Sequence, residues 1–382
     1  MPKTRIQELS DLGQSIWLDY ISRSLLESGK LQKMIEDGLR GMTSNPSIFH
    51  QAISSSSDYD TKIKELSTHR KSTLQIYDEL TIADIRQAAD IFLPLYQSTN
   101  RLDGYVSLEI NPLLANNTEE SIAEGKRLFQ LVDRPNVMIK VPATEAGFPV
   151  IEELLAEGVN VNVTLIFSLQ QYIDTADAYL KGLSRLAKRR ADLSQIRSVA
   201  SVFVSRIDTA IDKILEDRAS RQDDEQLRAK LLSLRGKAAV ANSKIIFAKF
   251  KEIFSEDQFH SLIVQGAEAQ RVLWGSTGTK NPQYSDIKYV TELIGRPTVN
   301  TLPEKTIAAF LDHGVVHESL SVNLQEACQV IASLREFDID IDAVCCQLLE
   351  EGLGAFDKAF TDLLSSIELK SQSLAKVSQS TK

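Results

Sequence analysis

The sequence predicts an α/β fold, a single (β/α)₈ TIM barrel with extra C-terminal helices, and three observations support this prediction. Short β-rich runs alternate with longer amphipathic patterns, which is typical of βα units around a parallel sheet. Eight such runs occur along the chain, and eight parallel strands close this type of barrel. The 382 residues fit one enlarged barrel, because such barrels run to about 250 residues and often carry insertions.

The eight expected strands are short β-rich runs. They are Ser15–Asp19, Leu39–Thr43, Gly104–Ile110, Val137–Val141, Val159–Leu165, Ser198–Val204, Arg271–Ser276 and Thr298–Thr301. The stretches between them carry apolar residues at helical steps, as in Ile245, Ile246 and Phe250. We expect these helices to form the outer ring of the barrel.

After the last strand, apolar residues continue at three- and four-residue steps, from Leu353 through Phe356 and Phe360 to Ile367. This pattern predicts a final helix whose apolar face packs on the barrel. The closing segment SQSLAKVSQSTK has no such periodicity. We therefore predict one barrel domain over residues 1–370 and a disordered tail over residues 371–382.

The composition is that of an ordinary globular protein, with 43% hydrophobic and 25% charged residues. The formal net charge of −9 repels nucleic-acid phosphates, so we expect no nucleic-acid partner. An anionic small-molecule substrate would therefore have to be held by a local cluster of basic residues.

Cysteine usage and hydropathy predict a cytoplasmic protein. The three cysteines, Cys328, Cys345 and Cys346, form no CxxC pair, which favours a reducing compartment. The first residues lack an apolar signal region, and no stretch reaches the ~18 apolar residues of a membrane span. We therefore expect no membrane partner. The sequence indicates no particular oligomeric state.

Alternation along the expected strands predicts a polar site inside the barrel. In the fifth strand, Asn160, Asn162 and Thr164 share one parity, opposite to an apolar set. Because alternate strand residues point to opposite faces, the polar set should line the interior. Asp19 and Glu109 have the same interior parity on their own strands. By parity Trp17 and Trp274 also point inward, where they would pack or shape the pocket.

Lys140 is the most unusual of these interior residues, because a buried lysine is costly unless it is paired or used as a neutral amine. One interpretation is a structural ion pair with a nearby carboxylate. The other is a Schiff-base nucleophile, whose pKa must fall from ~10.4 to ~7–8 at a cost of about 4 kcal/mol. The residues around the lysine leave both interpretations open.

Motifs throughout the chain resemble those of the transaldolase family. They are Trp17-Leu18-Asp19, TSNPSIF from Thr43 to Phe49, Ser107-Leu108-Glu109, IKVPAT from Ile139 to Thr144, the run Asn160–Ser168, the run Ser201–Arg206 and the run Leu273–Pro282. TSNPSIF and IKVPAT are the most specific. Chain length and the segment WGSTGTKNP resemble the longer class of this family, which has extended C-terminal helices.

The resemblance implies a class I aldolase-type barrel that transfers a dihydroxyacetone unit between ketose and aldose phosphates. The expected reaction converts sedoheptulose 7-phosphate and glyceraldehyde 3-phosphate to erythrose 4-phosphate and fructose 6-phosphate in the non-oxidative pentose phosphate pathway. A lysine Schiff base serves as the electron sink, so we expect no cofactor and no metal. The implied partners are small-molecule sugar phosphates.

The resemblance also implies roles for individual residues. Lys140 corresponds to the imine-forming lysine, Glu109 to the carboxylate that works through a water, and Asp19 to the acid/base of carbon–carbon cleavage. The polar residues that would orient the donor hydroxyls and the catalytic water are Asn45, Asn162, Thr164 and Ser201. Amides and hydroxyls suit this task because they donate and accept hydrogen bonds without changing the charge of the amine. A structural salt bridge between a carboxylate and Lys140 remains an alternative.

The substrate phosphate is expected to bind at Arg206, which follows the sixth strand and has a planar guanidinium that can hold two phosphate oxygens. Ser276 and its loop, after a neighbouring strand, can add further donors. Shorter family members carry an arginine two residues after this serine, whereas this chain has Gly278. The nearest cation is Lys280, which we therefore name as the second phosphate ligand.

Two further sequence features could indicate other functions, nucleotide binding and metal binding. The segment from Gly275 to Lys280 is only a partial echo of a phosphate-binding loop, and His313 and His317 have helical metal-ligand spacing but no third ligand in view. We interpret these histidines as surface residues. Two alternative functions remain open: a fructose-6-phosphate aldolase that releases free dihydroxyacetone, and a non-catalytic barrel that binds sugar phosphates. The joint presence of Asp19, Glu109 and Lys140 argues against the second.

Overall fold

The computed structural model describes residues 2–189 and 192–380 and confirms the predicted barrel. Eight parallel strands pair in chain order, and β8 closes on β1 through pairs such as Trp17 with Thr301. The strands are β1 (Gln14–Asp19), β2 (Gly41–Thr43), β3 (Tyr105–Glu109), β4 (Val137–Pro142), β5 (Val161–Ile166), β6 (Ser198–Phe203), β7 (Arg271–Gly275) and β8 (Thr298–Leu302). All eight lie within or beside the ranges expected from the sequence.

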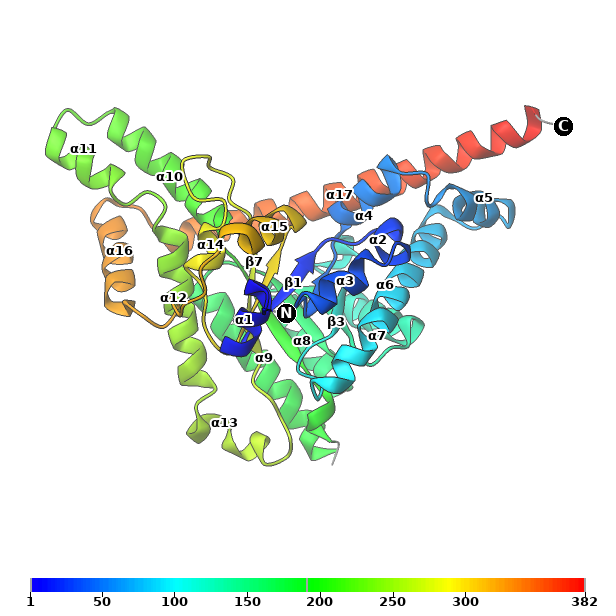
Figure 1. Ribbon diagram of the computed structural model, residues 1–382, viewed down its shortest axis with the longest axis horizontal. Helices are drawn as coiled ribbons and strands as arrows, with labels where there is room; N and C mark the ends of the chain where they lie inside the picture. Colours follow the sequence, from blue (N-terminus) through cyan, green and yellow to red (C-terminus); the bar gives the residue numbers. More distant parts are fainter. Residues whose placement is uncertain (1, 190–191, 381–382) are drawn as a thin grey trace.

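Helices surround the barrel (Figure 1). They are α1 (Arg5–Leu12), α2 (Arg23–Glu27), α3 (Lys30–Glu36), α4 (Pro46–Ser55), α5 (Asp60–Thr68), α6 (Thr73–Ser98), α7 (Thr118–Val132), α8 (Gly147–Ala156), α9 (Leu169–Lys188), α10 (Ser205–Ser220), α11 (Glu225–Leu232), α12 (Ala238–Ile253), α13 (Glu256–Ile263), α14 (Lys288–Thr291), α15 (Glu304–His313), α16 (Leu324–Glu336) and α17 (Ile341–Ser380), with the short 3₁₀ turns η1 (Pro112–Leu114) and η2 (Leu193–Gln195).

Local sequence signals begin several of these helices. Ser168 starts α9 with a capping box, because its hydroxyl accepts from the Gln171 N–H at 3.1 Å while the Gln171 side chain accepts from the Ser168 N–H at 3.1 Å. Asn45 starts α4 in the same position, with Oδ1 accepting from the Ile48 N–H at 3.0 Å. These caps fix the points at which the chain leaves β5 and β2.

An apolar layer fills the barrel interior below the ends of the strands. It consists of Trp17, Tyr96, Tyr105, Met138, Val199, Leu273 and Val299, all buried. The rings of Trp17 and Tyr105 stack with centroids 6.5 Å apart. This layer forms a solid floor, so an interior cavity can open only at the carboxyl end of the strands.

The inward orientation predicted for Trp274 is wrong. On β7 the interior positions are Leu273, which belongs to the apolar floor, and Arg271, whose guanidinium donates to Ser15 Oγ at 2.8 Å below it. Trp274 has the opposite parity and packs in the hydrophobic cluster between barrel and helices. The inward face of this strand could not be identified from parity, because the expected strand carries large apolar residues at both alternating sets of positions.

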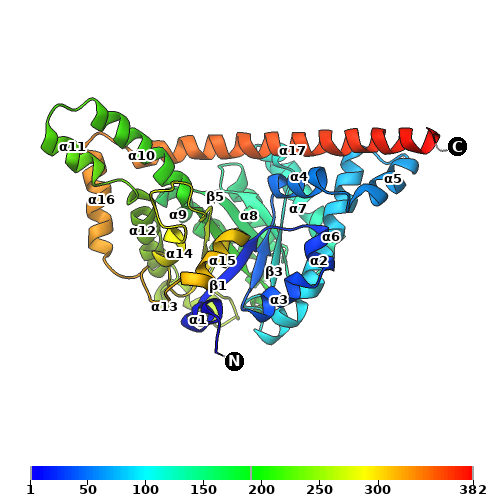
Figure 2. The ribbon, with the colours of Figure 1, turned by 45° about the horizontal axis from the view of Figure 1, so that its top comes forward.

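The C-terminal helix α17 crosses the carboxyl face of the barrel (Figure 2). It contacts α4, α5, α6, α10, η1 and β5. Where the sequence predicted a disordered tail from residue 371, the structure continues α17 to Ser380, and Leu374 packs against the core cluster. The last two residues of that predicted tail, Thr381 and Lys382, lie outside the described residues. The predicted packing of the final helix on the barrel agrees with these contacts.

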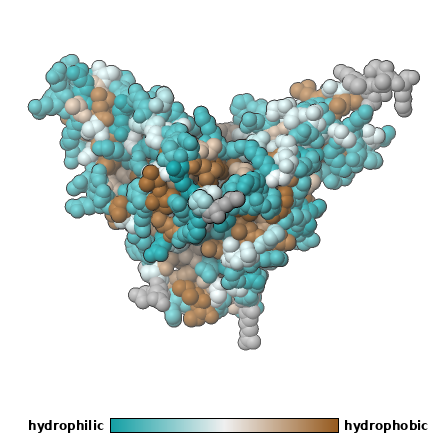
Figure 3. All heavy atoms as spheres, viewed as in Figure 1, coloured by the Kyte–Doolittle hydropathy of each residue, from teal (hydrophilic) through white to brown (hydrophobic). Residues whose placement is uncertain are grey.

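The view in Figure 3 shows a surface covered largely by hydrophilic residues, with apolar residues in small separate groups. Among the described residues, no helix combines the length and apolar character needed to cross a membrane.

Gly41 lies against the apolar floor, and a Cβ built on it would lie 2.5 Å from Cε2 of Trp17. Gly41→Ala should therefore lower the free energy of unfolding by about 1–3 kcal/mol, the usual cost of overpacking. Urea denaturation followed by circular dichroism measures this change.

The matched control is Gly354→Ala on α17, where a Cβ would meet no heavy atom within 4 Å. That variant should be neutral or more stable by about 0.5–1 kcal/mol, because alanine is the better helix former. Equal destabilisation of the two variants would show that the close approach of Gly41 to Trp17 does not limit packing.

Candidate active site

Neighbouring strands bring polar side chains together at the carboxyl end of the barrel. The register pairs Glu109 of β3 with Lys140 of β4, and Lys140 with Asn162 of β5. It likewise pairs Asp19 of β1 with Thr43 of β2. Because residues paired across adjacent strands point to the same face of the sheet, these positions share the barrel interior. The parity predicted for Asp19, Glu109 and Lys140 agrees with this register.

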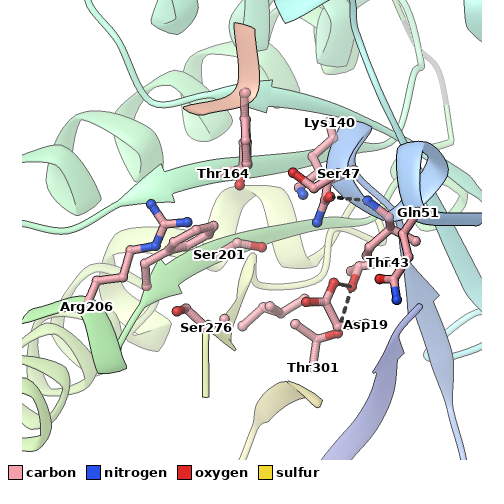
Figure 4. A pocket seen from close by; sticks show the side chains of 16 residues that line it. Asp19, Thr43, Ser47, Gln51, Lys140, Thr164, Ser201, Arg206, Ser276 and Thr301 are labelled. Atoms are coloured by element: carbon pink, nitrogen blue, oxygen red, sulfur yellow. Dashed lines mark hydrogen bonds between the residues drawn. The ribbon is translucent and has the colours of Figure 1, made fainter. Parts of the chain in front are cut away.

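A cavity of about 250 Å³ opens above the apolar floor. Its lining residues are Asp19, Thr43, Asn45, Ser47, Ile48, Gln51, Lys140, Thr164, Ser201, Phe203, Arg206, Leu273, Gly275, Ser276, Thr301 and Phe356. In Figure 4, Asp19, Thr43 and Thr301 gather on one side of this cavity and Arg206 lies on the opposite side. The cavity is thus polar at its base and cationic at one side.

Lys140 is buried, with 4% of its surface exposed. Its Nζ lies 3.4 Å from Oε2 of Glu109 and donates to the Ser44 carbonyl at 3.3 Å. The ring centroid of Phe356, from α17, lies 5.6 Å from the same Nζ. Both polar contacts are long for an ammonium group, so the amine is held in place and remains able to react.

The two carboxylates next to Lys140 hold protons more tightly than free carboxylates do. The pKa of Glu109 is raised to about 7, because burial and, to a smaller extent, the charge of Asp19 outweigh the lowering effect of Lys140. Burial also raises the pKa of Asp19, against the lowering effects of Lys140 and of the hydrogen bond from Thr43. A carboxyl group with a pKa of about 7, as at Glu109, can exchange protons near neutral pH.

Hydroxyls and amides connect the strand ends. Ser201 donates to Oδ1 of Asn162 at 2.6 Å, and the Asn162 amide donates to Ser107 Oγ at 2.9 Å. Thr43 donates to Asp19 Oδ1 at 2.7 Å and also lies 2.7 Å from the Thr301 hydroxyl. These networks fix the rotamers around the cavity before any ligand enters.

Two of the predicted polar residues retain bonding capacity toward the cavity. Thr164 Oγ1 is buried and has no hydrogen-bond partner among the described residues. Asn45 uses Oδ1 to cap α4, which leaves its amide group as a donor. A buried polar atom without a partner is costly, so a ligand hydroxyl at Thr164 would recover a lost hydrogen bond.

The predicted cations Arg206 and Lys280 border one cavity in common, but only Arg206 also lines the main cavity. Arg206, at the start of α10, lines the main cavity, and its Cζ lies 5.5 Å from the centroid of the Phe203 ring. Lys280 does not line the main cavity but lines an adjoining cavity of about 590 Å³, which Arg206 also borders, and a smaller one of about 210 Å³. Burial lowers the pKa of both, and the charge of Arg206 lowers the Lys280 pKa further. Within the described chain, neither forms an ion pair with a carboxylate.

Ser276, the third predicted phosphate contact, also lines the main cavity, and its hydroxyl lies 3.1 Å from that of Ser205. Its φ of +52° turns the chain sharply after β7.

Several cavity residues were not predicted. Thr301 has interior parity at the end of β8, a signal that the sequence contained. Phe356 could not be found by parity, because it comes from a helix whose position over the barrel depends on tertiary packing. Among the described residues, no three His, Cys, Asp or Glu side chains converge on a possible metal position. His313 is exposed and interacts with Asp286 at 3.0 Å.

Comparison with known proteins gives a consistent result over nearly the whole chain. Residues 16–367 match the family described as Transaldolase/Fructose-6-phosphate aldolase. The chain is 45% identical over 380 residues to the transaldolase of Trichodesmium erythraeum, covering 99% of this chain and 100% of that protein. It is 46% identical over 381 residues to transaldolase 2 of a Nostoc species, with the same coverage, and 46% identical over 366 residues to the transaldolase of Saccharopolyspora erythraea, covering 95% and 97%.

The raised pKa of Glu109 predicts a pH dependence of stability. In the unfolded chain this carboxyl has a pKa of about 4.3, whereas in the folded protein burial raises it to about 7. The folded state therefore binds the proton more tightly, and the free energy of unfolding should fall as pH rises between these two values. Glu109→Gln removes this contribution.

Urea denaturation at steps from pH 4 to pH 8 should show the wild type losing stability relative to Glu109→Gln up to about pH 7 and a constant difference above it. Glu119→Gln, which changes an exposed carboxylate of α7, is the control and should differ from wild type by a constant amount. A constant difference for Glu109→Gln as well would contradict the raised pKa.

Proposed function

The chain belongs to the transaldolase/fructose-6-phosphate aldolase family and acts as a transaldolase, and from this premise we propose that Lys140 forms the Schiff base through which it transfers a dihydroxyacetone unit. The observation that carries the proposal is the burial of Lys140 next to the buried Glu109, with the half-buried Asp19 in the wall of the same cavity. The proposed substrates are ketose and aldose phosphates, with sedoheptulose 7-phosphate and fructose 6-phosphate as donors.

In the proposed reaction the Lys140 amine attacks the carbonyl carbon of the donor, and loss of water gives an iminium ion. The iminium nitrogen accepts the electron pair of the neighbouring carbon–carbon bond, which can then break. An aldose phosphate leaves, and the three-carbon unit stays on Lys140 as an enamine. Attack of the enamine carbon on an acceptor aldehyde, followed by hydrolysis of the new iminium, releases the product ketose.

The two carboxylates suit different steps of this reaction. Glu109 lies 3.4 Å from Nζ, so it is placed to accept a proton from, and return it to, a water that adds or leaves next to the amine during imine formation and hydrolysis. Asp19 lines the cavity itself and can take the proton of the donor C4 hydroxyl as the carbon–carbon bond breaks. The raised pKa of each carboxyl supports these roles, because each must both accept and return a proton.

Polar and cationic residues around the cavity would position the rest of the substrate. Asn45, Asn162, Thr164 and Ser201 would orient the donor hydroxyls and the water. Arg206 and Ser276 would bind the phosphate, with Lys280 as the second cation from the adjoining cavity. Arg206 and Lys280 are neighbouring cations, and neither forms an ion pair with a carboxylate among the described residues. They therefore favour the binding of an anion, which the net charge of −9 would otherwise repel.

The assignment of Lys140 predicts that borohydride reduction in the presence of fructose 6-phosphate attaches a three-carbon unit to this lysine. Peptide mass mapping locates the modified residue. Lys140→Ala should form no adduct and should have no transferase activity, because the electron sink is lost. Modification of another lysine, or activity in Lys140→Ala, would disprove the assignment.

The carboxylates provide the controls for this experiment. Asp19→Asn should still be trapped by borohydride but should cleave the donor about 100- to 10,000-fold more slowly, the usual effect of losing a positioned acid/base. Glu109→Gln should also slow the trapping step. If both variants trap and cleave the donor at wild-type rates, the carboxylates are structural partners of Lys140.

Arg206→Ala should lower kcat/KM for glyceraldehyde 3-phosphate about 30-fold, because a charge-assisted contact to phosphate is lost. This corresponds to a loss of about 2 kcal/mol of transition-state stabilisation. Unphosphorylated glyceraldehyde should be affected much less. Lys280→Ala should act in the same direction but more weakly, since Lys280 does not line the main cavity.

The control is Arg221→Ala at the far end of α10, an exposed arginine that pairs with Asp217. It should leave both acceptors unchanged. Equal losses for glyceraldehyde and its phosphate in Arg206→Ala would mean that Arg206 supports the fold of the site and not the phosphate.

A further inference from the structure

The helix α17 docks closely on the barrel where β5 is irregular. The register of β5 with β6 shifts between Val163 and Ile166, and Leu165 in this bulge has a φ of +58°, in the left-handed region. Gly352 of α17 rests on this leucine, since a Cβ at Gly352 would lie 2.9 Å from Leu165 Cδ2. The missing side chain at Gly352 therefore lets α17 approach the end of β5.

Residues at four-residue steps from Gly352 lie on the same face of α17. Phe356 comes one turn later and lines the main cavity with 6% of its surface exposed. Phe360 comes one turn later again and packs edge-on against Tyr77, with ring centroids 5.2 Å apart. Gly352 and Phe360 thus hold the helix on both sides of Phe356, whose ring lies over the cavity.

Phe356 also lies close to the amine, with its ring centroid 5.6 Å from Nζ of Lys140. Glu109 and the Ser44 carbonyl contact the same nitrogen from the strands and their ends. The reacting nitrogen therefore has polar neighbours on the barrel and an apolar ring from the helix that crosses the barrel mouth (Figure 2).

We propose that Phe356 is a specificity-determining residue, which excludes bulk water from the enamine on Lys140 so that the three-carbon unit passes to an aldehyde instead of leaving as free dihydroxyacetone. The inference rests on the proposed Schiff base at Lys140 and adds a residue that decides between transfer and release of the three-carbon unit. It concerns the choice between two fates of one intermediate.

The two fates differ in what bonds to the enamine carbon. In transfer, this carbon bonds to the acceptor aldehyde carbon, whose oxygen takes up a proton, and hydrolysis of the iminium releases the longer ketose. In release, the carbon takes up a proton instead. Water then adds to the iminium carbon, the carbon–nitrogen bond breaks with its electron pair going to Nζ, and free dihydroxyacetone leaves. Only the second route needs a proton source at the enamine carbon before an aldehyde arrives.

The ring of Phe356 acts on this choice in two ways. It occupies the space through which solvent would reach the intermediate, and it offers no hydrogen-bond donor or acceptor to hold a water there. Its negative face also stabilises the positive iminium nitrogen, as for other cations within about 6 Å of an aromatic centroid. Exclusion of water lengthens the life of the enamine, and stabilisation of the iminium favours its formation from the donor ketose.

The test compares Phe356→Ala, Phe356→Leu and wild type with fructose 6-phosphate as donor, in the presence and absence of erythrose 4-phosphate. Nuclear magnetic resonance measures free dihydroxyacetone and sedoheptulose 7-phosphate. We expect Phe356→Ala to raise the ratio of free to transferred dihydroxyacetone by about tenfold or more. Phe356→Leu, which keeps apolar bulk but loses the aromatic face, should raise it less.

Phe360→Leu is the matched control, because it weakens the docking of the same helix without lining the cavity. It should lower thermal stability and change the product ratio less than either Phe356 variant does. An unchanged ratio in both Phe356 variants, or an equal rise in Phe360→Leu, would overturn the inference. If Phe356→Ala does not fold, the ratio in Phe356→Leu decides.

Borohydride trapping in each variant separates this inference from the proposed function. If wild type and variants are all labelled at Lys140 but share one product ratio, the role of Phe356 is wrong and the Schiff base stands. If wild type is not labelled at Lys140, the proposed function itself fails.

Discussion

The cost of burying an amine inside a barrel organises the rest of this structure. A lysine that is 4% exposed needs compensation, and here it comes from a buried carboxylate 3.4 Å away and one main-chain carbonyl. These contacts offset the cost only in part, and burial in turn raises the pKa values of Glu109 and Asp19. The result is an amine between two carboxyl groups whose pKa values are both raised.

That arrangement requires a rigid support below it. The aromatic and aliphatic floor from Trp17 to Val299 closes the barrel beneath the site, and Gly41 admits the Trp17 ring at a distance that no larger residue would allow. The polar network above the floor, from Ser201 through Asn162 to Ser107, is likewise complete without a ligand. The site is therefore preorganised, and little of the substrate's binding energy is needed to order it.

The alternation of strand and helix patterns was enough to predict the barrel. Strand parity was enough to predict which side chains of β1, β3 and β4 face its interior. Asp19, Glu109 and Lys140 lie on β1, β3 and β4, and alternation along each strand identified their interior face without any knowledge of contacts. It failed for Trp274, because β7 has large apolar residues on both faces and only the neighbouring strands decide which face is inside. Phe356 was out of reach, since a 3.6-residue periodicity identifies the buried face of a helix but not what that face covers. The continuation of the helix to Ser380 was not predicted for a similar reason, because contacts such as that of Leu374 with the core depend on tertiary packing.

One helix borders both cavities, and this links the chemistry of the amine to that of the phosphate. Phe356 of α17 lines the main cavity, while Gln347, Leu348 and Glu351 of α17 line the adjoining one, and Arg206 borders both. Glu351 is the charged group that raises the Arg206 pKa against the effect of burial. A phosphate at Arg206 would bring negative charge close to this carboxylate. Glu351 and Phe356 belong to the same continuous helix, so a shift of α17 at Glu351 would also shift Phe356 over Lys140. In this geometry the helix that we propose shields the covalent intermediate also borders the site proposed for the phosphate of the arriving aldehyde.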